Sequence, residues 1–167
     1  AKAPQTGIWG ESACGGTFGP ELKRAGYDGI VITGMSAAPV YLSIVDRKAR
    51  LEDASDLWGK DVYETTDALK ARDPGYKVLA IGQAGENLVK IASIGNDKGH
   101  FSGRTGLGAV MGSKRLKAVV VRGSAKPQKA DEALFKEVLK KALAEVKDSA
   151  LADGLHRQRN HAFDGRR

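Results

Sequence analysis

The sequence has few of the residues that build metal sites and no segment suited to a membrane. It contains one cysteine, Cys14, and three histidines, His100, His156 and His161, in 167 residues. A single cysteine excludes an internal disulfide and fits a reducing, cytoplasmic compartment. It also cannot by itself hold an iron–sulfur cluster or a Cys-rich zinc ion, because these sites need several ligands. No apolar run approaches the ~20 residues of a membrane span, so we expect no membrane association.

Positive charge is in modest excess. The net charge is +7, and aromatic residues make up only 6% of the chain. This bias suits an anionic ligand, but no RNP-like aromatic motif or helix-turn-helix pattern accompanies it. We therefore expect no nucleic-acid partner.

Glycine is abundant and gathers in two zones, residues 7–34 and 95–123. The chain has 21 glycines, well above the usual ~7%. One zone contains "SACGGTFGPELK" (12–23) and the other "GRTGLGAVMGSK" (103–114), and each leads into a predicted helix. Gly-rich turns without a ligand are common, but Arg104 among glycines at a helix start favours an anion. The second zone also leads into a helix, so the N-termini of both helices could face one ligand that carries two anionic groups.

Two nucleotide-binding motifs are disfavoured by residue order. A Walker A loop ends in Gly-Lys-Ser/Thr, whereas this stretch ends in "GSK", so the Lys and the hydroxyl cannot take their usual places. "GLGAVMG" has three residues where the dinucleotide fingerprint has two, and polar loop precedes it. Cys14 has no evident His and Asn or Asp partners, so a small packing residue is favoured over a nucleophile. No catalytic residue is predicted.

The order of elements predicts an α+β fold with mixed sheets, hairpins and short helices. Helices are predicted at 17–26 and 61–71, and a hairpin at 39–45 and 49–53. The amphipathic pattern of 131–152 predicts one further helix. Further strands are predicted at 27–34, 77–82, 88–95 and 116–123. The segments 83–87 and 96–105 are predicted as loops.

Several motifs in the same order resemble those of the aldehyde ferredoxin oxidoreductase family, the tungsten-pterin enzymes. The resemblance covers residues 2–150 with few gaps, which is far more specific than one Gly motif. The motifs are "KAPQTG" (2–7), "CGGTFGPELKRAGYDGIVITG" (14–34), "PVYL" (39–42), "DASDLWGKDVYET" (53–65), "IGQAGENLVKIASIGND" (81–97) and "GRTGLGAVMGSKRLKAVVVRG" (103–123).

The resemblance implies a cofactor and a reaction. Family members carry a bis-molybdopterin cofactor with tungsten or molybdenum, and Mg²⁺ bridges its two phosphates. They oxidise aldehydes to carboxylic acids and pass electrons through a [4Fe–4S] cluster to ferredoxin. The cluster ligands are absent from this sequence, so we expect a truncated chain, inactive alone. A homodimer is a further expectation for the full-length form.

The resemblance also implies binding residues. The first contact zone falls on Ala13 and Gly15, and the second on His100, Phe101, Gly103 and Arg104. The backbone carbonyls of Ala13 and Phe101 are expected to bind the bridging Mg²⁺. Members often have Asn at the position of Ala13 and Arg at the position of His100. The histidine of this chain would donate to a phosphate in a pH-dependent way. A further phosphate-binding Arg of the family would lie before residue 1.

The expected domain limits follow the same resemblance. Residues 1–124 would form the C-terminal part of the N-terminal tungstopterin-binding domain, a base built of two similar halves. Residues 125–153 would be a linker and the first helix of a following helical domain, and 154–167 a disordered or out-of-register tail. The alternative is a non-catalytic globular domain that keeps the fold without the cofactor.

Overall fold

The computed structural model describes residues 1–147, 149 and 152–154. They fall into two compact units, Ala1–Pro127 and the described residues from Gln128 onward. The predicted limits of 1–124 and 125–153 stay predictions, and the predicted tail beyond Gly154 lies outside the described residues. None of the described helices is both long and apolar enough to cross a membrane.

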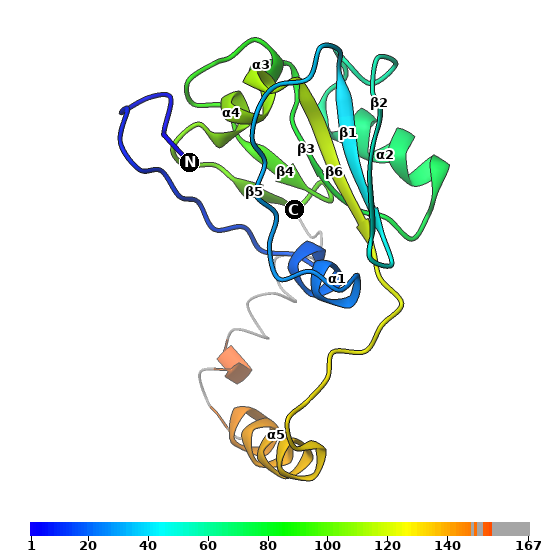
Figure 1. Ribbon diagram of the computed structural model, residues 1–167. Coiled ribbons are helices and arrows are strands. Elements are labelled where there is room, and N and C mark those ends of the chain that lie inside the picture. Colours follow the sequence, from blue (N-terminus) through cyan, green and yellow to red (C-terminus); the bar gives the residue numbers. More distant parts are fainter. Residues whose placement is uncertain (148, 150–151, 155–167) are drawn as a thin grey trace, which may run out of the picture. The chain divides into compact units, whose positions relative to one another are not determined.

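The first unit is built on one mixed sheet, which confirms the predicted α+β class (Figure 1). Its strand order is β2-β1-β6-β3-β4-β5. β1 and β6 run parallel, and the other neighbouring pairs are antiparallel. The strands are β1 Val40–Val45, β2 Lys48–Asp53, β3 Lys77–Ala80, β4 Ile94–Asn96, β5 His100–Ser102 and β6 Leu116–Arg122.

Both faces of the sheet are covered, and β6 supplies side chains to both. Val119 and Val121 enter a core that includes Phe18 of α1 (Phe18–Arg24) and Met111 of α4 (Leu107–Ser113). Ala118 and Val120 enter the opposite core, which α2 (Val62–Arg72) covers with Leu69. A strand buried on both faces has a continuous apolar sequence, which is why "LKAVVV" was predictable.

The hairpin and the second helix are also confirmed. β1 and β2 join through Asp46 and Arg47, both with positive φ, as a two-residue hairpin turn requires. α2 begins with a capping box, in which Asp61 Oδ1 accepts from the Glu64 amide at 2.8 Å and Glu64 accepts from the Asp61 amide at 3.0 Å.

The strand predicted at 27–34 is wrong. This segment runs from α1 to the start of β1 without joining the sheet (Figure 1). Its apolar side chains gave the strand signal, but Val31 is 92% exposed. Among the described residues, no backbone hydrogen bond joins residues 28–33 to a neighbouring strand, and without one an apolar run does not become a strand.

The segment 83–102 also differs from its prediction. "QAGE" forms α3 (Gln83–Glu86) in place of a loop, and His100–Ser102 forms β5. Only 94–95 of the predicted strand 88–95 is a strand, as part of β4 (Ile94–Asn96). The reason lies in α4. The carbonyl of Ala92 accepts a hydrogen bond from the Gly108 amide of α4 at 2.9 Å. This carbonyl therefore pairs with a helix and not with a neighbouring strand.

The second unit contains the predicted amphipathic helix, α5 (Glu132–Lys147). Asp131 caps it by accepting from the Leu134 amide at 2.9 Å. None of the residues of α5 is buried. Its apolar stripe is Leu134, Phe135, Val138, Leu139, Leu143 and Val146.

A buried ion pair ties β6 to α3. Lys117 is 0% exposed and donates to the Glu86 carboxylate and, at 2.7 Å, to the carbonyl of Lys60. Both Glu86 oxygens also accept from the Gly59 amide, at 3.0 and 2.9 Å. Burial lowers the pKa of Lys117, and the Glu86 carboxylate opposes that shift. The cation is therefore held by its neighbours and not by solvent.

Glu86→Gln should lower the free energy of unfolding by about 3–5 kcal/mol, because it leaves a buried cation without its counter-charge. Urea denaturation followed by circular dichroism measures this change. The control is Glu52→Gln on β2, which makes no described ion pair and should cost less than about 0.5 kcal/mol. Adding Lys117→Met to Glu86→Gln should restore stability. A double variant no more stable than Glu86→Gln would show that the pair is not coupled in this way.

Candidate functional site

The two Gly-rich zones lie side by side, in opposite chain directions. The amide of Arg104 donates to Ser12 Oγ at 3.2 Å. Asn96 Nδ2 donates to the carbonyl of Gly15 at 2.6 Å. The neighbouring pairs are Gly10 with Thr105, Ser12 with Arg104, Gly15 with His100, and Gly16 with Asn96.

A pocket opens where these segments meet, and we call it the Arg104 pocket. It is lined by Ser12, Ala13, Phe101, Gly103 and Arg104. Four of the six residues predicted to bind the cofactor thus line one cavity, although they come from segments about ninety residues apart. The lining comes from the loop before α1 and from β5 and the turn after it, not from the first turns of α1 and α4.

The remaining two predicted residues lie beside this pocket and contact each other. A Cβ placed on Gly15 would stand 3.0 Å from His100 Nδ1, so the backbone of Gly15 lies against the imidazole. His100 is exposed at the start of β5. The structure therefore brings all six predicted residues into one region at the β5 edge of the sheet.

The charge of the Arg104 pocket is positive. Arg104 forms no ion pair with any described residue, and no carboxylate lines the pocket. A Cβ on Gly103 would meet nothing within 4 Å, so its backbone faces open space. A cation without a protein partner beside bare backbone can accept an anion that approaches closely.

Sequence reasoning missed two residues of the site, Ser12 and Asn96. Ser12 lay inside a quoted glycine motif but carried no distinctive signal. Asn96 is a polar residue that is only 2% exposed, on β4. Burial of a polar side chain in a three-residue strand cannot be read from local pattern, because it depends on the segment 12–16 packing over it.

The glycines after Arg104 serve packing. Gly106 stands immediately before α4, at its N-cap, with φ +70 in the left-handed region. A Cβ on Gly112 would stand 1.9 Å from the carbonyl oxygen of Gly85, and one on Gly108 2.4 Å from that of Ser93. α4 therefore packs directly on the backbone of α3 and of the segment 88–93, which holds the turn that carries Gly103 and Arg104.

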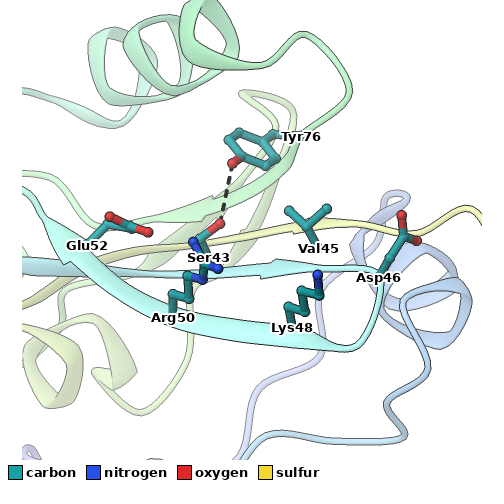
Figure 2. Close-up of a pocket in the computed structure, with 7 residues that line it drawn as sticks. All are labelled: Ser43, Val45, Asp46, Lys48, Arg50, Glu52 and Tyr76. Carbon is teal, nitrogen blue, oxygen red and sulfur yellow. Dashed lines mark hydrogen bonds between the residues drawn. The ribbon is translucent and has the colours of Figure 1, made fainter.

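A second pocket lies at the other edge of the sheet, on the β1–β2 hairpin (Figure 2). It is lined by Ser43, Val45, Asp46, Lys48, Arg50, Glu52 and Tyr76. The hydroxyls of Ser43 and Tyr76 lie 3.3 Å apart, and every charged group in it comes from β2 or the hairpin turn. Mixed charges on an edge strand keep the open edge from pairing with another chain, which accounts for this surface without a ligand.

The described residues show no group of three His, Cys, Asp or Glu side chains placed to hold a metal ion. A metal at the Arg104 pocket would therefore be bound through backbone carbonyls or through a cofactor.

The sequence and the fold match a known class of oxidoreductase domain. Residues 1–123 match the family model of the aldehyde ferredoxin oxidoreductase N-terminal domain, and the chain belongs to this family.

Among curated relatives, the chain is 46% identical over 155 residues to the tungsten-containing aldehyde ferredoxin oxidoreductase of Thermococcus kodakarensis, covering 92% of the chain and 26% of the relative. It is 37% identical over 162 residues to the WOR-like subunit of an aliphatic sulfonate oxidoreductase of Pyrococcus furiosus, covering 87% of the chain and 26% of that protein. The chain thus spans about a quarter of the length of these relatives.

Among solved structures, the chain is similar to the active site complex BamBC of benzoyl coenzyme A reductase, in complex with 1,5-dienoyl-CoA. The TM-score is 0.84 and the identity 42%, over 87% of this chain and 22% of that one.

The variants Gly103→Ala and Gly112→Ala should differ in the free energy of unfolding, because the fold requires a glycine at 112 but not at 103. Gly112→Ala should lower the free energy of unfolding by about 1–3 kcal/mol through overpacking against Gly85. Gly103→Ala should change it by less than about 0.5 kcal/mol, because its Cβ meets open space. Chemical denaturation of both variants decides this. A large loss for Gly103→Ala would mean that the fold itself needs that glycine.

Proposed function

We propose that this chain binds the phosphate end of a tungsten or molybdenum bis-molybdopterin cofactor in an oxidoreductase. The observation that carries the proposal is the convergence of Ala13, Phe101, Gly103 and Arg104 on one pocket. Gly15 and His100 lie beside it and complete the six proposed cofactor-binding residues. Two of the curated relatives are tungsten-containing enzymes, which supports tungsten as the metal.

The residues of the pocket fit an anionic group. Arg104 supplies a guanidinium without a described partner, and a guanidinium binds phosphate through paired, charge-assisted hydrogen bonds. Gly103 lets the phosphate approach the backbone. His100, which lies against Gly15, adds a second donor.

A bridging Mg²⁺ fits the same pocket. Two neighbouring phosphates repel each other, and a divalent cation offsets that charge. Mg²⁺ takes oxygen ligands, and we propose that the backbone carbonyls of Ala13 and Phe101 provide two of them. Both residues line the Arg104 pocket, one from each segment, so the cation would join the two segments.

The proposed reaction of the whole protein is oxidation of an aldehyde to a carboxylic acid, with ferredoxin accepting the electrons through a [4Fe–4S] cluster. When bound, the metal–pterin group supplies the redox chemistry, and the protein binds and orients it. Reduction of an aromatic acyl-CoA is the second candidate, since the identity to the benzoyl-CoA reductase complex, 42%, is close to the 46% of the aldehyde enzyme.

Binding of inorganic pyrophosphate with Mg²⁺ tests the proposed phosphate site in the 167-residue chain. Arg104→Gln should weaken binding about tenfold to a hundredfold, the equivalent of a hydrogen bond to a charged group. Gly103→Ala should weaken it as well, by blocking close approach. Isothermal titration calorimetry measures both.

The matched control is Arg50→Gln, which removes the same charge from the hairpin pocket at the opposite sheet edge. It should leave the affinity within about twofold, since surface charge acts weakly at a distance in salt. Equal losses for Arg50→Gln and Arg104→Gln would indicate a general charge effect and contradict the proposed site.

The chain alone should show no aldehyde oxidation, because we infer that the cluster ligands and the substrate pocket belong to other parts of the polypeptide. An assay that follows reduction of an oxidised dye by aldehyde, on the purified chain expressed in a host that makes the cofactor, checks this. Turnover by the chain alone would contradict the inference. Absence of pterin and of pyrophosphate binding would instead favour the alternative, a non-catalytic domain that keeps the fold.

A further inference from the structure

We propose that Asn96 is a positioning residue, which fixes where the backbone of the segment 12–16 lies against the β4–β5 hairpin. This inference rests on the proposed phosphate site, because its consequence is the shape of the Arg104 pocket. Asn96 is not among the six residues that sequence reasoning assigned, and it does not line the pocket itself.

The first support is the bond that Asn96 makes. Its Nδ2 donates to the carbonyl of Gly15 at 2.6 Å, and its backbone is held in β4 between Leu79 of β3 and His100 of β5. The donor is thus fixed by the sheet, whereas the acceptor belongs to a segment with no regular secondary structure. The bond therefore restrains the position of this segment relative to the sheet.

The second support is the glycine that lies against the amide. Gly16 has φ +94, and a Cβ on it would stand 2.5 Å from Asn96 Nδ2. Any other residue would force the loop away from Asn96. The close contact therefore requires both glycine at 16 and asparagine at 96. Ala13, which lines the Arg104 pocket, lies only three residues before Gly16.

The third support is an unpaired atom. Asn96 Oδ1 is buried and has no hydrogen-bond partner among the described residues. An unsatisfied buried acceptor costs free energy, and such groups in folded proteins call for an explanation beyond stability. An apolar residue would fill the same space without that cost, but it could not hold the Gly15 carbonyl.

Asn96→Asp tests this role with almost no change of shape. The carboxylate cannot donate, so the Gly15 carbonyl loses its partner and the segment 12–16 is released. We expect faster hydrogen exchange at the amides of Gly15 and Gly16, and affinity for Mg²⁺-pyrophosphate about tenfold lower. Asn87→Asp, an exposed site at the end of α3, makes the same charge change and should keep the wild-type affinity.

Lowering the pH provides a readout that a merely structural role would not give. A protonated aspartic acid regains a donor, so the affinity of Asn96→Asp relative to wild type should recover as the introduced carboxyl protonates. His100 lies beside the same contact in both proteins, so the ratio to wild type at each pH removes its contribution and that of pyrophosphate itself.

Gly16→Ala approaches the same contact from the other side and covers the case in which Asn96→Asp does not fold. It keeps Asn96 but displaces the loop, and it should lower the affinity about tenfold as well. If the wild type does not bind pyrophosphate, the proposed phosphate site fails, and this inference with it. If the wild type binds and either folded variant binds equally well, Asn96 does not position the site and this inference alone is overturned.

Discussion

The close approach of two backbone segments is the constraint on which the candidate site depends. The loop before α1 lies against β4, β5 and the turn after β5 at distances that side chains would prevent. Gly10, Gly15 and Gly16 each face a neighbour that a Cβ would meet at 3.0 Å or less. The Asn96–Gly15 hydrogen bond fixes the register of this approach. Without the approach, Ala13 and Arg104 would not line the same pocket.

The rest of the fold holds β4, β5 and the turn after β5 in place for this approach. β6 anchors the sheet by filling both cores, and its neighbour β3 carries β4 and then β5 at the edge. α4 packs glycine to backbone on α3 and on the segment 88–93. The buried Lys117–Glu86 pair joins α3 to β6. These contacts keep the wall formed by β5 and the turn after it fixed relative to the sheet, and a rigid frame is what a binding site needs in order to hold a ligand in one geometry.

Much of this arrangement was predictable from sequence, and the exceptions have physical reasons. The α+β class, the β1–β2 hairpin, α2 and β6 follow from turn residues, caps and apolar patterns, which are local. The segments 27–34 and 88–93 carry the same apolar signal but do not pair, because strand formation depends on a partner that no local pattern shows. α3 and β5 are short, and three or four residues give too little periodicity to recognise.

The candidate site was predictable for a different reason. The glycine motifs suggested that the two Gly-rich zones face one anionic ligand, and the family resemblance supplied the individual positions. Asn96 was not found, since its role comes from burial under a distant loop. Whether the six residues bind a cofactor stays a prediction.

The measurement that bears most directly on the central claim is the map of amide chemical-shift changes when the isotope-labelled chain is titrated with Mg²⁺ and inorganic pyrophosphate. We predict that the changes concentrate in residues 12–16 and 100–105, on the two sides of the Arg104 pocket. Changes concentrated at the hairpin pocket of Lys48 and Arg50, or no saturable change at all, would contradict the claim that this chain holds a cofactor phosphate.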